Sequence, residues 1–129
     1  IPARDVSGTL HTLQFIMPDG AKRFLTGGRI VGCYYAMGRP AGELLLAEGL
    51  ATGATLHLAT GAAVACCFNC SNLLPVAKAL RQKFPGERII VCADDDNATP
   101  GNPGVTHATA AARAVGGFVA VPKFPEVSA

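Results

Sequence analysis

From residue 42 onward the sequence alternates short, wholly apolar runs with segments that have the periodicity of helices. The apolar runs predict four strands, at residues 44–47, 63–68, 89–93 and 118–121. A strand that is apolar along its whole length has no side for water, so it belongs in a parallel sheet covered on both faces. This pattern constrains the fold most strongly, because it predicts an α/β domain with a parallel four-stranded sheet flanked by helices.

Three helices are expected between these strands. Gly61 ends the first and the Gly116-Gly117 pair ends the third, because glycine readily adopts the left-handed conformation that closes a helix. Ser71 or Asn72 can cap the second, which has Pro75 in its first turn, where a missing N–H does least harm. The helices are expected over residues 50–60, from 71 or 72 to 84, and over 106–115.

Residues 1–41 have a different pattern, which indicates a small antiparallel β meander. The runs TLHTLQFIM and KRFLTGG are separated by the turn signal Pro18-Asp19-Gly20, and RIVGCYYAM follows a pair of glycines. The chain of 129 residues is about the size of one domain. We therefore expect the meander at 1–41 to be the amino-terminal part of one unit with the α/β domain at 42–129.

Acidic side chains follow two of the predicted strands. Glu48 comes directly after the first strand, and Asp94, Asp95 and Asp96 come after the third. Ligands of such sheets bind beyond the carboxyl ends of the strands. If the two strands are neighbours, the carboxylates converge and their repulsion raises at least one pKa unless a cation lies among them. Oxygen ligands without imidazole or thiolate favour Mg²⁺ or Mn²⁺ over zinc. A solvated turn that caps its own amides is the alternative for the aspartates.

Other acidic and nucleotide-binding motifs do not fit these residues. An EF-hand loop begun at Asp94 would need Asp or Asn, Gly and Glu where Ala98, Thr99 and Val105 stand. A phospho-aspartyl phosphatase usually carries DxDx[TV] after an early strand, whereas Asn97 and Ala98 follow the aspartates here, after the third strand. Neither GxxxxGK[ST] nor GxGxxG occurs, so the two common nucleotide cradles are absent from the sequence.

The order of these segments resembles the Toprim domain shared by bacterial-type primases, type IA and type II topoisomerases and OLD-family nucleases. The resemblance covers residues 43 to about 124 and rests on Glu48-Gly49 and on Asp94-Asp95-Asp96 after the first and third strands. The runs LLAEGLATGATLHLATG and IIVCADDDNATPGNPGVTHATAAARAVGG are most similar to the Toprim segments of plasmid and phage primases, including those of conjugative transfer. LQFIMPDGAKRFLTGGRIVGCYYAMG also resembles the segment that precedes Toprim in those proteins.

The resemblance implies a site and a cofactor. Glu48 matches the Toprim glutamate, implied to act as general acid or base, with metal ligation as the alternative. Asp94 and Asp96 match the outer letters of DxD and are implied to hold Mg²⁺ or Mn²⁺ with Glu48, whereas Asp95 occupies the variable letter. Many Toprim sequences place a glycine soon after DxD. Here residues 97–103 intervene, so that Gly101 or Gly104 takes that place.

The resemblance also implies a reaction and its partners. The expected activity is metal-dependent nucleotidyl transfer, the synthesis of RNA primers on single-stranded DNA from nucleoside triphosphates. The chain begins at Ile1 without Met, so we expect a Toprim part of a larger primase with zinc-binding or helicase domains in the same polypeptide.

Three alternatives stay open at this point. Strand cleavage of the nuclease or topoisomerase type keeps the fold, although a topoisomerase needs a tyrosine nucleophile and Tyr34 and Tyr35 lie in a predicted strand. A phosphoacceptor receiver wants an acidic pair after its first strand and a lysine after its last, which Lys123 fits loosely. The third alternative is a module that binds metal or nucleic acid without turnover.

Charge, cysteine content and hydropathy indicate the partners and the cellular location of the protein. A net charge of +2 does not by itself indicate nucleic-acid binding. Five cysteines, an odd number, mostly in strand-like runs, predict reduced packing residues. No apolar run approaches the roughly 18 residues that span a bilayer, so we expect a cytoplasmic protein without a membrane partner. Template contacts would come from scattered basic residues: Arg23, Arg29, Arg39, Lys78, Arg81, Lys83, Arg88, Arg113 and Lys123.

Overall fold

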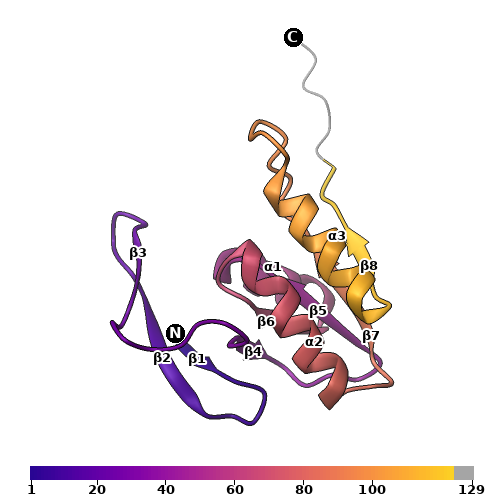
Figure 1. Cartoon of the computed structure of the whole chain (residues 1–129), viewed down its shortest axis with the longest axis horizontal. Coiled ribbons are helices and arrows are strands. Elements are labelled where there is room, and N and C mark those ends of the chain that lie inside the picture. Colours follow the sequence, from indigo (N-terminus) through magenta and orange to yellow (C-terminus); the bar gives the residue numbers. More distant parts are fainter. Residues whose placement is uncertain (124–129) are drawn as a thin grey trace.

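A five-stranded sheet forms the centre of the computed structural model, which describes residues 1–123 (Figure 1). The strand order is β4-β6-β5-β7-β8. Four of these strands run parallel, which confirms the predicted parallel sheet, and β4 joins β6 in the antiparallel sense. Their bounds are Tyr35–Met37 for β4, Glu43–Ala47 for β5, Ala63–Cys66 for β6, Arg88–Cys92 for β7 and Phe118–Ala120 for β8.

Helices cover both faces of this sheet. The helices are α1, Leu50–Thr60, α2, Leu73–Lys83, and α3, Pro103–Val115, with the single 3₁₀ turn η1, Cys70–Asn72, before α2. Helix α1 packs on β5 and β6 on one face, while α2 and α3 pack against each other on the other face (Figure 1). None of the helices in residues 1–123 combines the length and apolar character needed to cross a membrane.

Two predicted boundaries move in the structure. The strand predicted over 63–68 ends at Cys66, because Phe68 has a positive φ of 76° that an extended strand does not allow. The third helix begins at Pro103 instead of residue 106. Asn102 accepts a hydrogen bond from the Val105 N–H as a cap, and Pro103 occupies the first turn of the helix.

The amino-terminal segment forms a separate three-stranded antiparallel sheet. It consists of β1, Pro2–Arg4, β2, Leu10–Ile16, and β3, Lys22–Phe24, in that order. The predicted hairpin of β2 and β3 is confirmed, and it projects from the α/β body (Figure 1). The expectation that RIVGCYYAM adds the next strand to this meander is wrong. A turn at residues 30–33, closed by Cys33 N–H to the Ile30 carbonyl at 2.8 Å, redirects the chain, so Tyr35–Met37 pairs with β6.

Cysteines serve as packing residues, as the sequence predicted. Four of the five are buried, and none of the five forms a disulfide in the described part of the chain. Cys66 and Cys67 are wholly buried at the end of β6. Burial raises the pKa of the Cys67 thiol well above its usual value, which keeps it protonated and unreactive.

One buried side chain, that of Asn72, joins the amino-terminal segment to the α/β body. Its Nδ2 donates to the carbonyls of Cys33 at 2.9 Å and Cys67 at 2.8 Å, and its Oδ1 accepts from the Gly32 N–H at 2.8 Å. The Asn72 residue is 3% exposed. It therefore satisfies backbone groups that β4 and β6 leave without partners at this junction.

We expect Asn72→Ala to lower the free energy of unfolding by about 2–4 kcal/mol, because buried carbonyls and an N–H lose their partner without access to water. Urea denaturation followed by circular dichroism measures the change. Ser71→Ala is the matched control, since Ser71 is an exposed neighbour whose hydroxyl donates to Asn69 Oδ1 at the surface. Equal stability of the two variants would contradict this role of Asn72.

Candidate functional site

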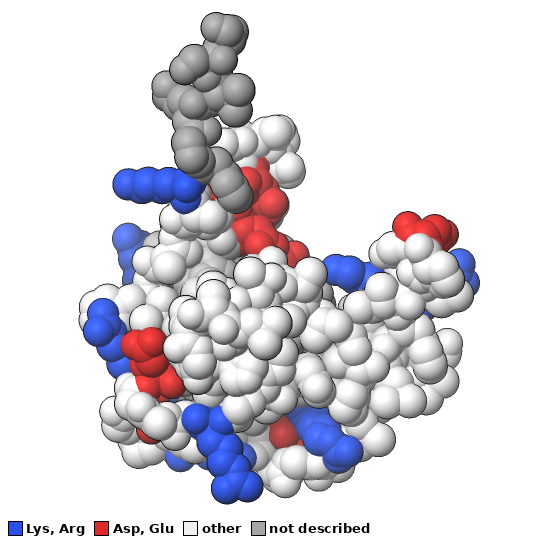
Figure 2. All heavy atoms as spheres, turned by 180° about the vertical axis from the view of Figure 1, so that it is seen from behind, with Lys and Arg blue, Asp and Glu red and all other residues white. Residues whose placement is uncertain are grey.

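The carboxylates that follow β5 and β7 meet at one rim of the sheet. The two strands are adjacent and parallel, with Ala47 opposite Cys92. Glu48 therefore leaves β5 beside the point where the chain turns into Asp94. Figure 2 shows an acidic patch at this end of the molecule. The predicted convergence of the carboxylates required the two strands to be neighbours, and the structure confirms that they are.

The strongest electrostatic effect at this rim acts on Glu48. The pKa of Glu48 is raised from 4.5 to about 7, mainly because the side chain is partly buried. Asp94, which lies within hydrogen-bonding reach, and the negative charges of Asp94 and Asp96 raise it further. Two carboxyl groups within hydrogen-bonding reach cannot both be ionised without cost, and this cost contributes to the raised pKa of Glu48. Glu48 can therefore accept or release a proton at physiological pH, and the paired carboxylates attract a cation.

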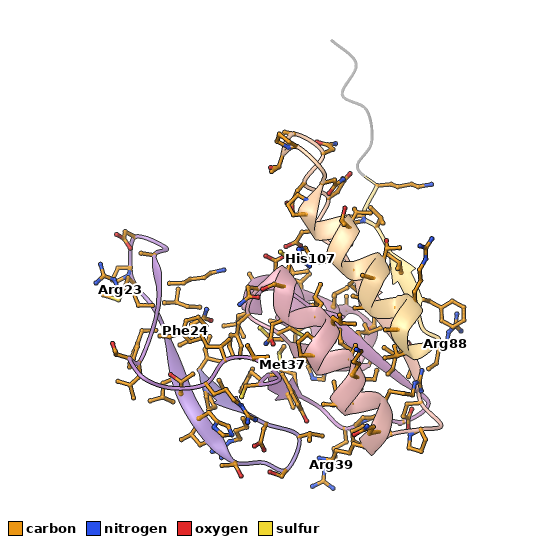
Figure 3. The ribbon with its side chains drawn as sticks, viewed as in Figure 1. Arg23, Phe24, Met37, Arg39, Arg88 and His107 are labelled. Carbon is orange, nitrogen blue, oxygen red and sulfur yellow. The ribbon has the colours of Figure 1, made fainter. Side chains whose placement is uncertain are left out.

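Lys22 supplies a positive charge to this rim from the β2–β3 hairpin. Its Nζ lies 3.7 Å from the place where a Cβ on Gly49 would stand, and its charge partly lowers the raised pKa of Glu48. Phe24, on the same face of β3, packs edge-to-face on Phe68 with ring centroids 5.5 Å apart. This contact fixes the face of β3 that carries Lys22, while Arg23 lies on the other face and points outward (Figure 3).

Asp96 caps helix α3 with one of its carboxylate oxygens. Its Oδ2 accepts a hydrogen bond from the Gly104 N–H at 2.8 Å, in the first turn of the helix. A Cβ on Gly104 would overlap the carbonyl oxygen of Asp94 and stand 2.7 Å from Asp96 Oδ2. Gly104 is therefore the glycine that the close approach of α3 requires, whereas Gly101 serves a left-handed turn at φ 78°.

Asn102 clasps the acidic turn to the start of α3. Its Oδ1 accepts from the Asp96 N–H at 2.9 Å and, at 3.4 Å, from the Val105 N–H, while its Nδ2 donates to Asp95 Oδ1 at 2.8 Å. Asn102 holds a left-handed backbone with φ 41°, which asparagine tolerates better than most residues. The clasp therefore engages the exposed carboxylate of Asp95 and fixes the backbone of Asp96 next to α3.

The oxygen donors fit a hard divalent cation, although their side chains do not form a complete cage. Within residues 1–123, no three His, Cys, Asp or Glu side chains converge closely enough to hold a metal ion by themselves. Glu48 pairs with Asp94, while Asp96 Oδ2 is engaged with Gly104. Magnesium is commonly held by one or two carboxylates together with water and substrate phosphates, so this donor set suits Mg²⁺ or Mn²⁺.

Sequence reasoning missed two residues of this site and included one that has another role. Lys22 and Asn102 were not among the candidates, because neither stands in a recognisable motif. Arg81, one of the basic residues considered for the template, instead donates to the carbonyls of Val115 and Glu87, at 2.9 and 2.6 Å, and joins the ends of α2 and α3. In the sequence, the position of Lys22 just after the hairpin turn at residues 18–20 was the only indication that its side chain could reach the rim.

We expect Glu48→Gln to stabilise the metal-free protein at pH 8 by about 1 kcal/mol, with a smaller gain at pH 5. Folding raises the pKa of Glu48 from 4.5 to about 7. Between these pH values the folded protein keeps the Glu48 proton, whereas the unfolded chain has lost it. The wild type therefore loses stability as pH rises from about 4.5 through 7, and the glutamine variant lacks this loss. Urea denaturation in EDTA at both pH values measures it, and an equal gain at both would contradict the raised pKa.

We expect Asn102→Ala to lower the free energy of unfolding by about 1–2 kcal/mol, because the helix cap and the bonds to the acidic turn are lost together. Thermal or urea denaturation measures the change. Asn97→Ala is the control, because Asn97 is an exposed residue of the same loop. If both variants unfold alike, the clasp contributes nothing.

Comparison with known proteins agrees with this geometry. The profile of the Toprim domain family matches residues 43–126. Two Escherichia coli proteins, each named DNA primase TraC, are 42% identical to this chain over 133 residues. The alignments cover 96% of this chain but only 12% and 9% of the two relatives.

The family match begins at the start of β5 and includes every carboxylate of the rim described above. The 42% identity also extends over almost the whole amino-terminal sheet, since it covers 96% of the chain. The chain spans about a tenth of the length of these curated relatives. On this evidence the chain belongs to the Toprim domain family and is similar to a segment of two proteins named as DNA primases.

Proposed function

We propose that this chain is the Toprim part of a larger primase and carries out metal-dependent nucleotidyl transfer, joining ribonucleotides into RNA primers on single-stranded DNA. The observation that supports the proposal most directly is the meeting of Glu48 and Asp94 at the rim, with Lys22 facing them. Paired carboxylates beside a lysine are what a reaction on a triphosphate needs, namely donors for a divalent cation and a charge for the phosphates.

Glu48, Asp94 and Asp96 would hold Mg²⁺ or Mn²⁺ at this rim. When bound, such an ion polarises the phosphoryl oxygens and lowers the energy of the charge that develops in the transfer. Asp94 lies within reach of Glu48, and Asp96 has one carboxylate oxygen, Oδ1, beyond its bond to Gly104. Asp95 is engaged by Asn102 and is left out of this set.

Glu48 is suited to move the proton of the attacking 3′-hydroxyl. A general base works best when its pKa lies near the working pH, and burial with the neighbouring carboxylates brings the pKa of Glu48 to about 7. Lys22 on β3 would contact the phosphates of the incoming nucleoside triphosphate. In this arrangement the hairpin contributes directly to the site, which is why residues 1–41 are proposed as part of the same catalytic unit as 42–129.

The proposed partners are single-stranded DNA, nucleoside triphosphates and further domains of the same polypeptide, of the zinc-binding or helicase kind. The relatives are named as primases and are about ten times longer than this chain, which supports such a context. A cytoplasmic location follows from the proposed substrates. Tyrosine-mediated strand cleavage is not supported by Tyr34, since its side chain belongs to the core and the residue is only 9% exposed.

Primer synthesis by the full-length polypeptide tests the proposal. With single-stranded DNA, ribonucleoside triphosphates and Mg²⁺, Glu48→Gln and Asp94→Asn should each lower the rate of primer formation by about a hundredfold or more. Asp19→Asn is the control, because Asp19 lies in the exposed β2–β3 turn and its amide keeps the oxygen that accepts from Ala21.

Full activity of the Glu48→Gln variant would remove Glu48 from the mechanism. Nicking of DNA without primer formation by the wild type would favour strand cleavage over primer synthesis. Binding of Mn²⁺ to the chain, followed by electron paramagnetic resonance, gives a readout independent of turnover and should weaken in Asp94→Asn.

A further inference from the structure

A cavity of about 410 Å³ lies at the end of the sheet opposite to the carboxylates. Its floor is formed by alanines of β4 and β6: Ala36, Ala63 and Ala65. Since Ala63 begins β6, the cavity lies at the amino-terminal ends of the parallel strands. In Figure 3 Arg39 of the cavity lies at the lower edge of the molecule, and His107 of α3 lies well above it.

The hollow exists because the covering helices lie over other strands. On this face α2 contacts β5 and β7, and α3 contacts β7 and β8. The side chains of the floor on β4 and β6 are alanine methyl groups, which leave space above the sheet. Leu80 of α2 and Phe84, which follows the helix, form one wall of this space. Interiors are normally close-packed, and apolar cavities of about 300–1,000 Å³ with a few polar groups are typical of small-molecule sites.

The charges around this cavity are all positive. Arg39 and Lys83 line it, and no Asp or Glu does. In the described part of the chain, the ion pairs that form are those of His11 and Arg29 with Asp5, so neither cavity cation has an anionic partner. Two unpaired cations beside an apolar floor favour a ligand with an anionic group.

Lys83 closes one end of the cavity. Its Nζ donates to the Val6 carbonyl at 3.0 Å, which ties the end of α2 to the segment after β1. This strut separates the cavity from an adjoining hollow of about 270 Å³ beside β1. A cavity of about 410 Å³ has the size of a small-molecule site.

We propose that this cavity binds a mononucleotide, with the base on the alanine floor between Tyr34 and Phe84 and the phosphate at Arg39 and Lys83. A planar base suits a cavity whose lining combines alanine methyl groups with two aromatic side chains. Arginine and lysine are the usual partners of phosphate oxygens. The cavity has no carboxylate for a metal ion, so it is an effector site separate from the rim, and it does not depend on the function proposed above.

Titration of the ¹⁵N-labelled chain with adenosine 5′-monophosphate in EDTA tests the proposal, since EDTA removes metal from the carboxylate rim. The amide resonances of Ala36, Ala63 and Ala65 should shift, while those of Gly49 and Asp95 stay in place. Shifts confined to the rim would overturn the proposal.

Variants of the cavity sharpen this experiment. Arg39→Gln and Lys83→Gln should each weaken binding about tenfold, the usual effect of losing one charged hydrogen bond. Lys78→Gln is the matched control, because Lys78 is an exposed cation of the same helix that does not line the cavity. Ala36→Leu, at an exposed floor position, should block the cavity while the dispersed spectrum shows that the chain is folded.

Two fragments of the nucleotide separate its base from its phosphate. Adenosine and ribose 5-phosphate should each bind at least about tenfold more weakly than the complete nucleotide, because each lacks one set of contacts. Ribose 5-phosphate that binds as tightly as the nucleotide would reduce the cavity to an anion site and reject the proposed base contact. Unchanged binding by Arg39→Gln would reject the proposed phosphate contact.

Discussion

The pairing of β5 with β7 is the contact on which the candidate site depends. It brings together residues that are 46 positions apart in the chain, Glu48 and Asp94, because parallel strands in register end at the same rim. No local propensity could do this. β5 is buried beyond its first residue and β7 is mostly buried, and their apolar side chains pack against α1 on one face and against α2 and α3 on the other. The stability of the core therefore holds the carboxylates together against their own repulsion.

That repulsion is compensated only in part within the chain. Lys22 reaches the rim from β3, and the Gly104 N–H and Asn102 take up Asp96 and Asp95. Glu48 and Asp94 are left facing each other, and the pKa of Glu48 stays near 7. A site that remains short of positive charge gains stability from a cation or a proton, so in the proposed reaction metal binding would be coupled to proton transfer.

The sequence predicted the elements that depend on local signals. The bounds of α1 agree with the predicted helix over 50–60, because Gly49 and Gly61 delimit it, and the parallel strands follow from their uninterrupted apolar runs. The destination of Tyr35–Met37 could not be predicted, since an antiparallel edge strand and a third meander strand have the same pattern. The reach of Lys22 was equally hidden, because it depends on the packing of Phe24 against Phe68 across the two sheets.

The segment between the aspartates and α3 shows how an irregular loop can preserve a site. Residues 97–102 lengthen the connection, yet Gly104 still lets the helix approach the Asp94 carbonyl, and Asn102 bridges the start of the loop to its end. Asn102 bonds to Asp95, to the Asp96 N–H and to the Val105 N–H, so one side chain joins the acidic turn to the first turn of α3. The side-chain clasp therefore holds the acidic turn against the start of α3 although residues 97–101 lie between them.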